Sequence, residues 1–218
     1  MCIRDRYKVL QIVKLESEGI ADTDVLIGSV AAGPASDPTR PGLLFHPVAV
    51  NCAYDGTIIV LEDTKFSTGT VTTTVSRLAA YDMNLNPVNR FNDAQGAPSQ
   101  WLYLADPADN YYLDIAVVGD NQMTYIYVLY YTGAGDSPSD YNMSIYTYGG
   151  SAPSANPLVT TNGIAAANLA VDMWHTAYVL NFPMVTDGAG HAAGPTNAST
   201  GPAGRTVPSV SMWLPPVP

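Results

Sequence analysis

The side chains best suited to metal binding or proton transfer are few and widely spaced. The three histidines stand at positions 46, 175 and 191. None belongs to a His-Glu-x-x-His motif, which would place two zinc ligands on one helix face, so the sequence lacks a helical zinc site. His46 and His175 each precede or open an apolar segment. A strand-end histidine satisfied by backbone groups is the simplest interpretation of both.

Clustered acidic side chains suggest calcium binding as a second kind of chemistry. The pattern of an EF-hand loop with its distant glutamate is missing, so only an irregular site between loops stays open. Solvated turn carboxylates explain the same residues. The candidate ligands are Asp106, Asp109, Asp114, Asp136 and Asp140.

Acid-base hydrolysis needs two carboxylates about 5 to 10 Å apart across a cleft. Among the acids of the predicted inner strands, only the pairs Glu62/Asp63 and Asp114/Asp172 could converge in this way. The sequence contains no G-x-S-x-G elbow, and its glycine-rich segments lack the lysine and the strand-to-helix context of a phosphate cradle. We therefore assign no catalytic and no cofactor-binding residue, and we leave a divalent metal such as calcium open.

Tyrosines are concentrated in the middle of the chain. Pairs of aromatic residues across neighbouring strands stabilise a sheet by about 0.2 to 1 kcal/mol each, so sheet packing can account for them. Alternatively, exposed tyrosines beside Asn and Asp can stack on sugars or anchor a protein partner. The residues are Tyr111, Tyr112, Tyr125, Tyr127, Tyr130, Tyr131, Tyr141, Tyr146 and Tyr148.

Cysteine and asparagine carry two further signals. Cys52 stands alone on a predicted buried strand, where it is expected to be a small core residue rather than a nucleophile or half of a disulfide. Asn142-Met-Ser144 and Asn197-Ala-Ser199 match N-glycosylation sequons, which have meaning only in a eukaryotic secretory context.

Composition and charge exclude two classes of partner. Charged residues make up 13% of the chain, and 18 Gly, 17 Pro and 14 Tyr favour many short strands joined by turns. The formal net charge of -10 repels phosphate backbones, so no nucleic-acid partner is expected. The strongest apolar run, Tyr125 to Tyr131, is far shorter than the roughly 20 residues of a membrane helix, so no membrane span is expected.

The strands that must position these side chains form an internal repeat. Three segments open with a short apolar strand and continue into a more apolar strand that contains Val-Leu. The opening strands are 46–53, 112–118 and 168–172, and the Val-Leu strands are 57–63, 125–131 and 176–182. The Asp55-Gly56 pair predicts a tight hairpin between the first two strands.

Each segment then continues into a strand of alternating polar and apolar residues. These strands are 76–82, 141–147 and 208–213, and their alternation predicts that one face is buried and the other meets water. A short fourth element, 87–91 or 157–160, completes the first two units. Four strands with the most apolar ones first are typical of a propeller blade, whose inner strands are covered on both faces by neighbouring blades.

The first unit also resembles a known family. Asp55-Gly-Thr-Ile-Ile-Val-Leu-Glu62, followed by Ser76-Arg-Leu-Ala-Ala-Tyr-Asp82, resembles the blade of an NHL-repeat β-propeller. The resemblance covers residues 46–91, and in the second unit the arginine of the pattern is replaced near Asn142. It implies an all-β fold, a partial β-propeller of about three four-stranded antiparallel blades plus an N-terminal remnant.

We divide the chain accordingly into residues 1–42, a leader with a partial N-terminal sheet and a linker, and residues 43–218, the propeller-like repeat region. The repeat units are about 43–97, 98–162 and 163–218. Residues 7–18 and 24–31 are predicted strands of an earlier sheet, and the insert 186–204 is predicted to be an exposed loop. The first six residues resemble adapter sequence translated from assembled metagenomic reads, which predicts a C-terminal fragment of a longer protein.

Three functions are consistent with this organisation. We favour a non-enzymatic binding or scaffold protein that contacts a protein or glycan through its propeller-like face and loops. The resemblance implies a second function, because NHL-like propellers include metal-dependent lyases and sugar-acid lactonases with a divalent metal in the central channel, which His46 and His175 could approach. The third is a self-assembling extracellular structural protein, since open sheet edges associate readily. An extracellular or cell-surface location is favoured over others.

Overall fold

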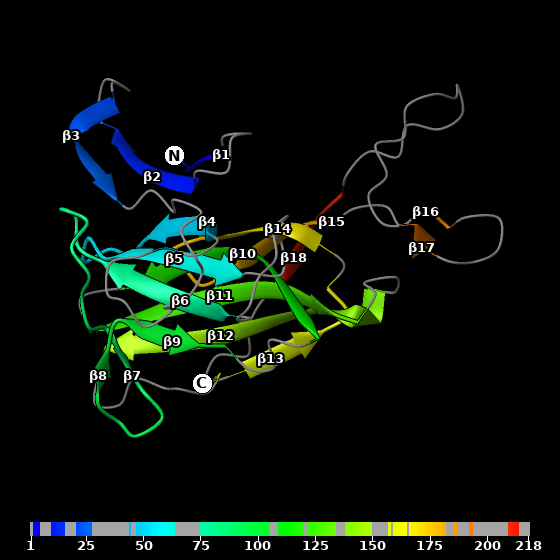
Figure 1. Ribbon diagram of the computed structural model, residues 1–218. Coiled ribbons are helices and arrows are strands. Elements are labelled where there is room, and N and C mark those ends of the chain that lie inside the picture. The colour runs from blue at the N-terminus through cyan, green and yellow to red at the C-terminus, as the bar shows by residue number, and fades with distance from the viewer. Residues whose placement is uncertain are drawn as a thin grey trace.

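The computed structural model describes residues 2–4, 10–15, 21–27, 44, 47–63, 75–104, 109–119, 122–133, 138–149, 157, 159–164, 166–181, 185–186, 192–193 and 209–213. Across these residues the protein is all-β, and its sheets are antiparallel (Figure 1). A single turn of 3-10 helix, η2 (Pro138–Asp140), is the one helical element within this part of the chain. No described helix has the length and apolar character needed to cross a membrane.

Three sheets follow the predicted repeat along the chain. The first sheet contains β4 (Pro47–Cys52), β5 (Ile58–Asp63), β6 (Ser76–Tyr81) and β9 (Trp101–Tyr103), in that order. The second contains β10 (Asn110–Gly119), β11 (Met123–Thr132), β12 (Tyr141–Gly149) and β13 (Val159–Asn162). The third contains β14 (Ala166–Val171), β15 (Ala177–Asn181) and β18 (Ser209–Trp213). The predicted strand order is thereby confirmed for the first three strands of each sheet.

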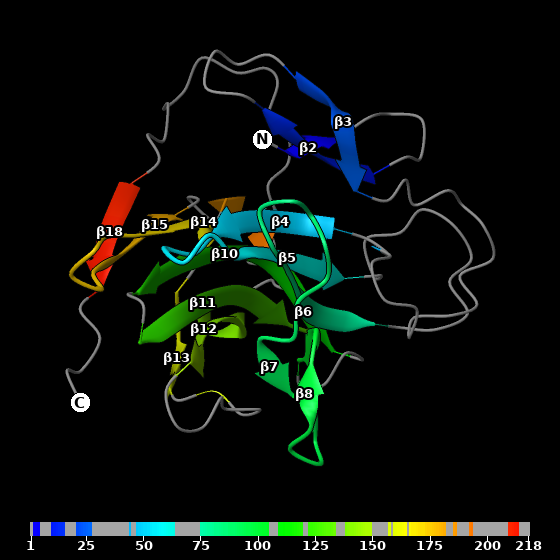
Figure 2. The same ribbon diagram turned by 90° about the vertical axis from the view of Figure 1, so that its left-hand side faces the viewer.

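Smaller sheets flank these three. The strands β1 (Cys2–Arg4), β2 (Leu10–Leu15) and β3 (Ala21–Ile27) form an N-terminal sheet. The strands β7 (Phe91–Asn92) and β8 (Pro98–Ser99) form a hairpin that projects below the larger sheets in Figure 2, and β16 (Val185–Thr186) pairs with β17 (Ala192–Ala193). No described sheet closes on itself.

The fourth strand of the first sheet is not where the sequence predicted it. Residues 87–91 supply an isolated bridge between Pro87 and Tyr81 and the first residue of β7. The strand that pairs with β6 is instead β9, with Leu102 opposite Leu78. The β7–β8 hairpin intervenes, so the chain returns to the sheet later than a local pattern can indicate.

The second sheet lies between the other two, and its first strand β10 is adjacent to both β4 and β14. One hydrophobic core joins the first and second sheets, with Leu61 and Leu78 packed in the same cluster as Ile126 and Val128. Another hydrophobic core joins the second and third sheets, and in it Leu129 packs with residues of β14 and β15. Both faces of the second sheet are therefore covered by neighbouring sheets.

The three Val-Leu pairs keep the same orientation from sheet to sheet. They lie at 60–61, 128–129 and 179–180. Leu61 and Leu129 pack against the sheet that follows their own. Val128 and Val179 pack against the sheet that precedes their own. Because side chains alternate between the faces of a strand, Leu180 points away from the second sheet. The repeat found in the sequence is thus a repeat of packing direction as well.

The alternating third strands of the first two sheets are buried on both faces, which corrects the prediction there that one face meets water. All six residues of β6 are buried, as are seven of the nine in β12. Their polar side chains find partners inside the protein: Arg77 pairs with Glu62, and the Ser144 hydroxyl bonds to that of Thr160 at 3.0 Å. Buried polar groups are tolerated when they are hydrogen-bonded, so alternation alone did not predict exposure.

The position of Cys52 also differs from the prediction. It is exposed, because β4 is an edge strand of the first sheet and Cys52 is its last residue before a turn. The opening strand is half-buried along most of its length, whereas the adjacent Val-Leu strand is almost fully buried. Pairing on one side only explains the difference, since an edge strand has a neighbour on a single side.

Candidate functional site

Four turns of the protein share one five-residue hydrogen-bond pattern. They span residues 53–57, 82–86, 93–97 and 172–176. In each, the first N–H donates to the fifth carbonyl at 2.8–3.1 Å, and the fourth N–H donates to the first carbonyl at 2.9–3.0 Å. The fourth residue has a φ between 65° and 82°, in the left-handed region; the four residues are Gly56, Leu85, Gly96 and His175.

Aspartate begins three of these turns and stabilises them through its side chain. In each of Asp82, Asp93 and Asp172, Oδ1 accepts hydrogen bonds from the N–H groups two and four residues later, at 2.8–2.9 Å. Such side-chain bonds to the backbone are a common way of stabilising a turn. Asp-x-x followed by a left-handed residue is therefore a turn signal that the sequence contained beyond the Asp55-Gly56 pair.

Hydrogen bonding keeps two of these carboxylates ionised. The N–H and side-chain bonds from Asn86 lower the pKa of Asp82 below its usual value of 3.8. Desolvation raises the pKa of Asp172, but the hydrogen bonds from Thr176, Tyr178 and Trp174 outweigh it, and the net pKa is lowered. Both turns therefore carry a full negative charge at neutral pH.

Two of the turns lie at the same end of the three sheets. The Tyr148 hydroxyl of β12 donates to Asp55 Oδ1 at 3.2 Å, which joins turn 53–57 to the second sheet. The ring of His175, in turn 172–176, meets the ring of Tyr125 edge to face at 4.7 Å, which joins the third sheet to the same end of the second. We call the surface formed by turns 53–57 and 172–176 and by the ends of β11 and β12 between them the turn end.

Large apolar side chains are exposed at the turn end. Trp174 is 77% exposed, Tyr54 76% and Met173 73%, and Tyr178 also reaches solvent. Folding normally buries apolar side chains of this size. A group of exposed apolar side chains on a protein surface therefore indicates an interaction site. These residues were not singled out from the sequence, because nothing local distinguishes an exposed tryptophan from a buried one.

An arginine occupies the turn end beside the first turn. Arg90 Nη2 lies 3.3 Å from Asp55 Oδ2, and its Nε donates to the Thr57 hydroxyl at 2.9 Å. The guanidinium carbon is 5.9 Å from the centre of the Tyr148 ring. Desolvation raises the pKa of Asp55, but the bonds from Thr57 and the charge of Arg90 outweigh it and lower the pKa. One carboxylate and one aromatic ring together hold this cation.

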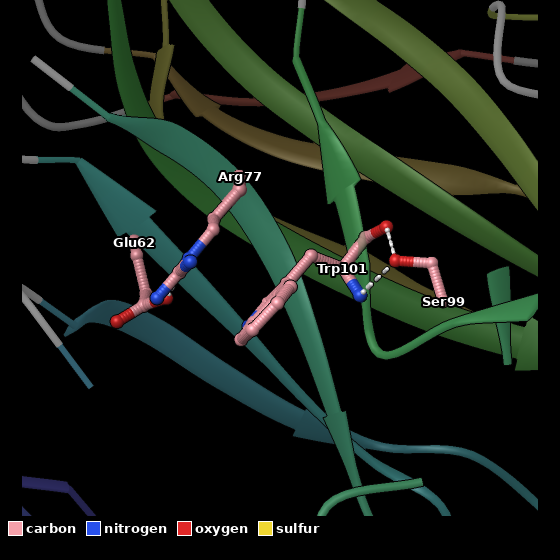
Figure 3. A network of polar contacts seen from close by, with 4 residues as sticks. All are labelled: Glu62, Arg77, Ser99 and Trp101. Atoms are coloured by element: carbon pink, nitrogen blue, oxygen red, sulfur yellow. Dashed lines mark hydrogen bonds and ion pairs between the residues drawn. The ribbon is translucent and has the colours of Figure 1, made fainter. Parts of the chain in front are cut away.

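A second arginine is held in the same way inside the first sheet (Figure 3). Arg77 Nε lies 2.5 Å from Glu62 Oε2, and its guanidinium carbon stands 4.7 Å from the centre of the Trp101 ring. Trp101 is positioned by Ser99, whose hydroxyl donates to the Trp101 carbonyl and accepts from its N–H. Glu62 and Arg77 are 0% exposed, so this group joins β5 to β6 and offers nothing to a ligand from solution.

One member of each predicted acid pair links two sheets, whereas Glu62 pairs with Arg77 inside the first sheet and Asp172 stabilises its own turn. Asp63 accepts from the Ser76 hydroxyl at 3.2 Å and from the Tyr112 N–H at 2.9 Å, which ties the first sheet to β10. Asp114 accepts from the Leu169 N–H at 2.8 Å, which ties β10 to β14. Burial raises the pKa of Asp114, although these backbone bonds oppose the shift. Each carboxylate accepts backbone N–H groups of the next sheet, as a structural link requires.

The tyrosines of the second unit pack within the sheets, which confirms the structural interpretation. Tyr131 stacks on Tyr111 at 4.8 Å and meets Tyr141 at 5.5 Å, and all three are register partners across β10, β11 and β12. None of the nine is among the exposed large apolar residues. Among the described residues, the exposed tyrosines are Tyr54, Tyr103 and Tyr178, which belong to the first and third units.

The other predicted ligands do not converge in the part of the chain that the structure describes. No group of three or more His, Cys, Asp or Glu side chains there could hold a metal ion. Asp109 is exposed beside β10, and Asp140 ends η2. Outside the described residues lie His46, His191, Asp106, Asp136 and Asn197. The amide of Asn142, in the first sequon, is buried and donates to the Asp140 carbonyl at 2.6 Å.

The chain matches no protein-family model and no curated protein. The geometry of its own residues is accordingly the basis of any functional conclusion.

Proposed function

We propose that this protein is a non-enzymatic binding or scaffold protein that contacts a protein or glycan through its turn end. We also propose that the three sheets are successive blades of an incomplete β-propeller. Two features support the blade arrangement: the inner strands β4, β10 and β14 lie next to one another, and the Val-Leu pairs keep one packing direction. In propellers, the loops at one end of such a stack form a common surface.

The observation that carries the binding function is the exposure of Tyr54 and Trp174 on two hydrogen-bonded turns of the same end. Both side chains stand at the second or third position of the shared turn pattern, where the backbone hydrogen bonds do not involve them. We expect the fold not to depend on their aromatic rings, because both are largely exposed. Tyr and Trp are enriched at binding surfaces because they combine a large apolar area with few rotatable bonds.

Two binding assays of the full chain test this function. One uses an array of immobilised oligosaccharides, and the other uses a series of peptides that differ in net charge. The double variant Tyr54→Ser/Trp174→Ser is compared with the wild type and with Tyr103→Ser. Tyr103 is a matched control, since it is 51% exposed on β9 and lies outside the turn end. We expect at least one probe to bind the wild type and Tyr103→Ser equally and to bind the double variant at least tenfold more weakly.

Two outcomes contradict the proposal. One is that no probe binds the folded wild type at micromolar concentration. The other is that every probe that binds is affected equally by the double variant and by Tyr103→Ser, which would place the contact away from the turn end.

A further inference from the structure

The protein twice encloses an arginine between a carboxylate and an aromatic ring. Arg77 lies between Glu62 and Trp101, and Arg90 lies between Asp55 and Tyr148. The carboxylate supplies charge and hydrogen-bond acceptors, and the ring face attracts the flat guanidinium through its quadrupole. In both groupings, a carboxylate and an aromatic ring together hold an arginine guanidinium.

A carboxylate and an exposed aromatic residue also stand on one turn beside the third sheet. Asp172 Oδ1 accepts from the N–H groups of Trp174 and Thr176 at 2.9 Å, and Oδ2 accepts from the Tyr178 hydroxyl at 3.0 Å. Oδ2 keeps capacity for a further donor, because a carboxylate has about two acceptor sites on each oxygen and Oδ1 already accepts two hydrogen bonds. The Trp174 ring and the Tyr178 side chain are both exposed. Among the described residues, no lysine or arginine pairs with Asp172.

We propose that turn 172–176 and Tyr178 form a binding site for an arginine side chain of a protein partner. The proposal rests on the binding function assigned to the turn end and names its partner class, a segment rich in arginine. The guanidinium lies against the exposed Trp174 ring and pairs with Asp172, as Arg90 pairs with Asp55 and faces Tyr148. The formal net charge of -10 favours the approach of such a segment through long-range attraction.

Arginine fits this site better than the other candidates. Lysine carries a compact, strongly hydrated charge and lacks the planar surface that stacks on a ring. A sugar could stack on Trp174, but its binding does not require the charge of Asp172. The dependence on that charge therefore separates an arginine site from a sugar site.

Isothermal titration of the full chain with a hexa-arginine peptide, at low ionic strength, tests the site. Trp174→Leu removes the ring and keeps an apolar side chain. Asp172→Asn removes the charge and keeps the Oδ1 acceptor that the turn needs. Asp93→Asn is the matched control, because Asp93 holds turn 93–97 through the same two N–H bonds and no aromatic residue follows it in that turn. Circular dichroism confirms that each variant is folded.

We expect the Kd for hexa-arginine to rise at least fivefold in Trp174→Leu and in Asp172→Asn, and to change less than twofold in Asp93→Asn. Hexa-citrulline, which has the same length and shape without the charge, should not bind. The proposal is overturned if Trp174→Leu binds hexa-arginine as the wild type does, or if Asp93→Asn weakens binding as much as Asp172→Asn. The latter result would mean that only the overall charge matters.

The same experiment distinguishes failure of this site from failure of the proposed function. If hexa-arginine does not bind, but an oligosaccharide or an uncharged peptide does so in a manner sensitive to Trp174→Leu, the arginine site is wrong and the turn end remains a binding surface. If no probe binds at all, both proposals are wrong.

Discussion

Arg77 in the first sheet lies between Glu62 and Trp101 with neither charged side chain reaching solvent, whereas Asp172 and Trp174 in the third sheet stand on an exposed turn. The chemical groups are alike, a carboxylate and an indole. Burial makes the first grouping part of the folded structure, because separating its charges would leave one of them unpaired in an apolar interior. Exposure makes Asp172 and Trp174 available to a partner at little expected cost to the stability of the fold.

The same contrast holds between the second and third sheets. The second is covered on both faces, and its tyrosines pair with one another. On the third, Val179 faces the core while Tyr178 is exposed. Tyr178 and Val179 are adjacent on one strand and point to opposite faces, so the neighbouring sheet covers Val179 and leaves Tyr178 exposed. The following variants test how far this contrast extends, from the largest expected effect to the smallest.

Breaking the buried pair should have the largest effect. Arg77→Met should lower the free energy of unfolding by about 3 to 5 kcal/mol, since it leaves the Glu62 carboxylate buried without a counter-charge. Arg90→Met, which breaks a partly exposed pair, should lower it by less than about 1 kcal/mol. Urea unfolding followed by circular dichroism measures both. Equal losses of unfolding free energy in the two variants would contradict the distinction between the buried Arg77 pair and the partly exposed Arg90 pair.

Replacing both partners should recover much of that loss. In Glu62→Met/Arg77→Met no charge is left in the interior, and apolar side chains of similar length occupy the same volume. We expect the double variant to be more stable than Arg77→Met alone in the same urea titration. A double variant no more stable than the single one would show that the stability depends on a contact other than this pair.

The carboxylate links between sheets should have an intermediate effect. Asp63→Ala removes the acceptor of the buried Tyr112 N–H, and an unsatisfied buried donor costs about 1 to 3 kcal/mol. Hydrogen exchange should show faster opening at Tyr112 than at the Leu169 N–H, which Asp114 binds. Uniform acceleration at both amides would indicate global rather than local destabilisation.

Acid should change the stability contributions of Asp114 and Asp172 in opposite directions. Burial raises the pKa of Asp114, so its ionised form opposes folding, and stability present at low pH is lost as pH rises through the folded-state pKa. The pKa of Asp172 is lowered, so its stabilising contribution is present above 3.8 and is lost as pH falls. The Tm deficit of Asp114→Asn should therefore be larger at about pH 3 than at about pH 7, and that of Asp172→Asn larger at about pH 7. Matching pH profiles in the two variants would contradict these shifts.

Removing the exposed ring should have the smallest effect on stability. Trp174→Leu should change the free energy of unfolding by less than about 0.5 kcal/mol, because surface substitutions away from structural features rarely exceed that value. Thermal unfolding measures it. A large loss would mean that the Trp174 side chain supports the fold and is not free for a partner.

The sequence alone predicted the local features of this protein. The Asp55-Gly56 hairpin, the order of the first three strands and the all-β class depend on side-chain periodicity and on the backbone freedom of glycine, which short segments express by themselves. The tertiary structure decided the rest: the pairing of β9 with β6, the burial of Arg77, and the exposure of Cys52 and Trp174. These features depend on which strands and sheets become neighbours. A local sequence pattern does not indicate which distant segment packs against it.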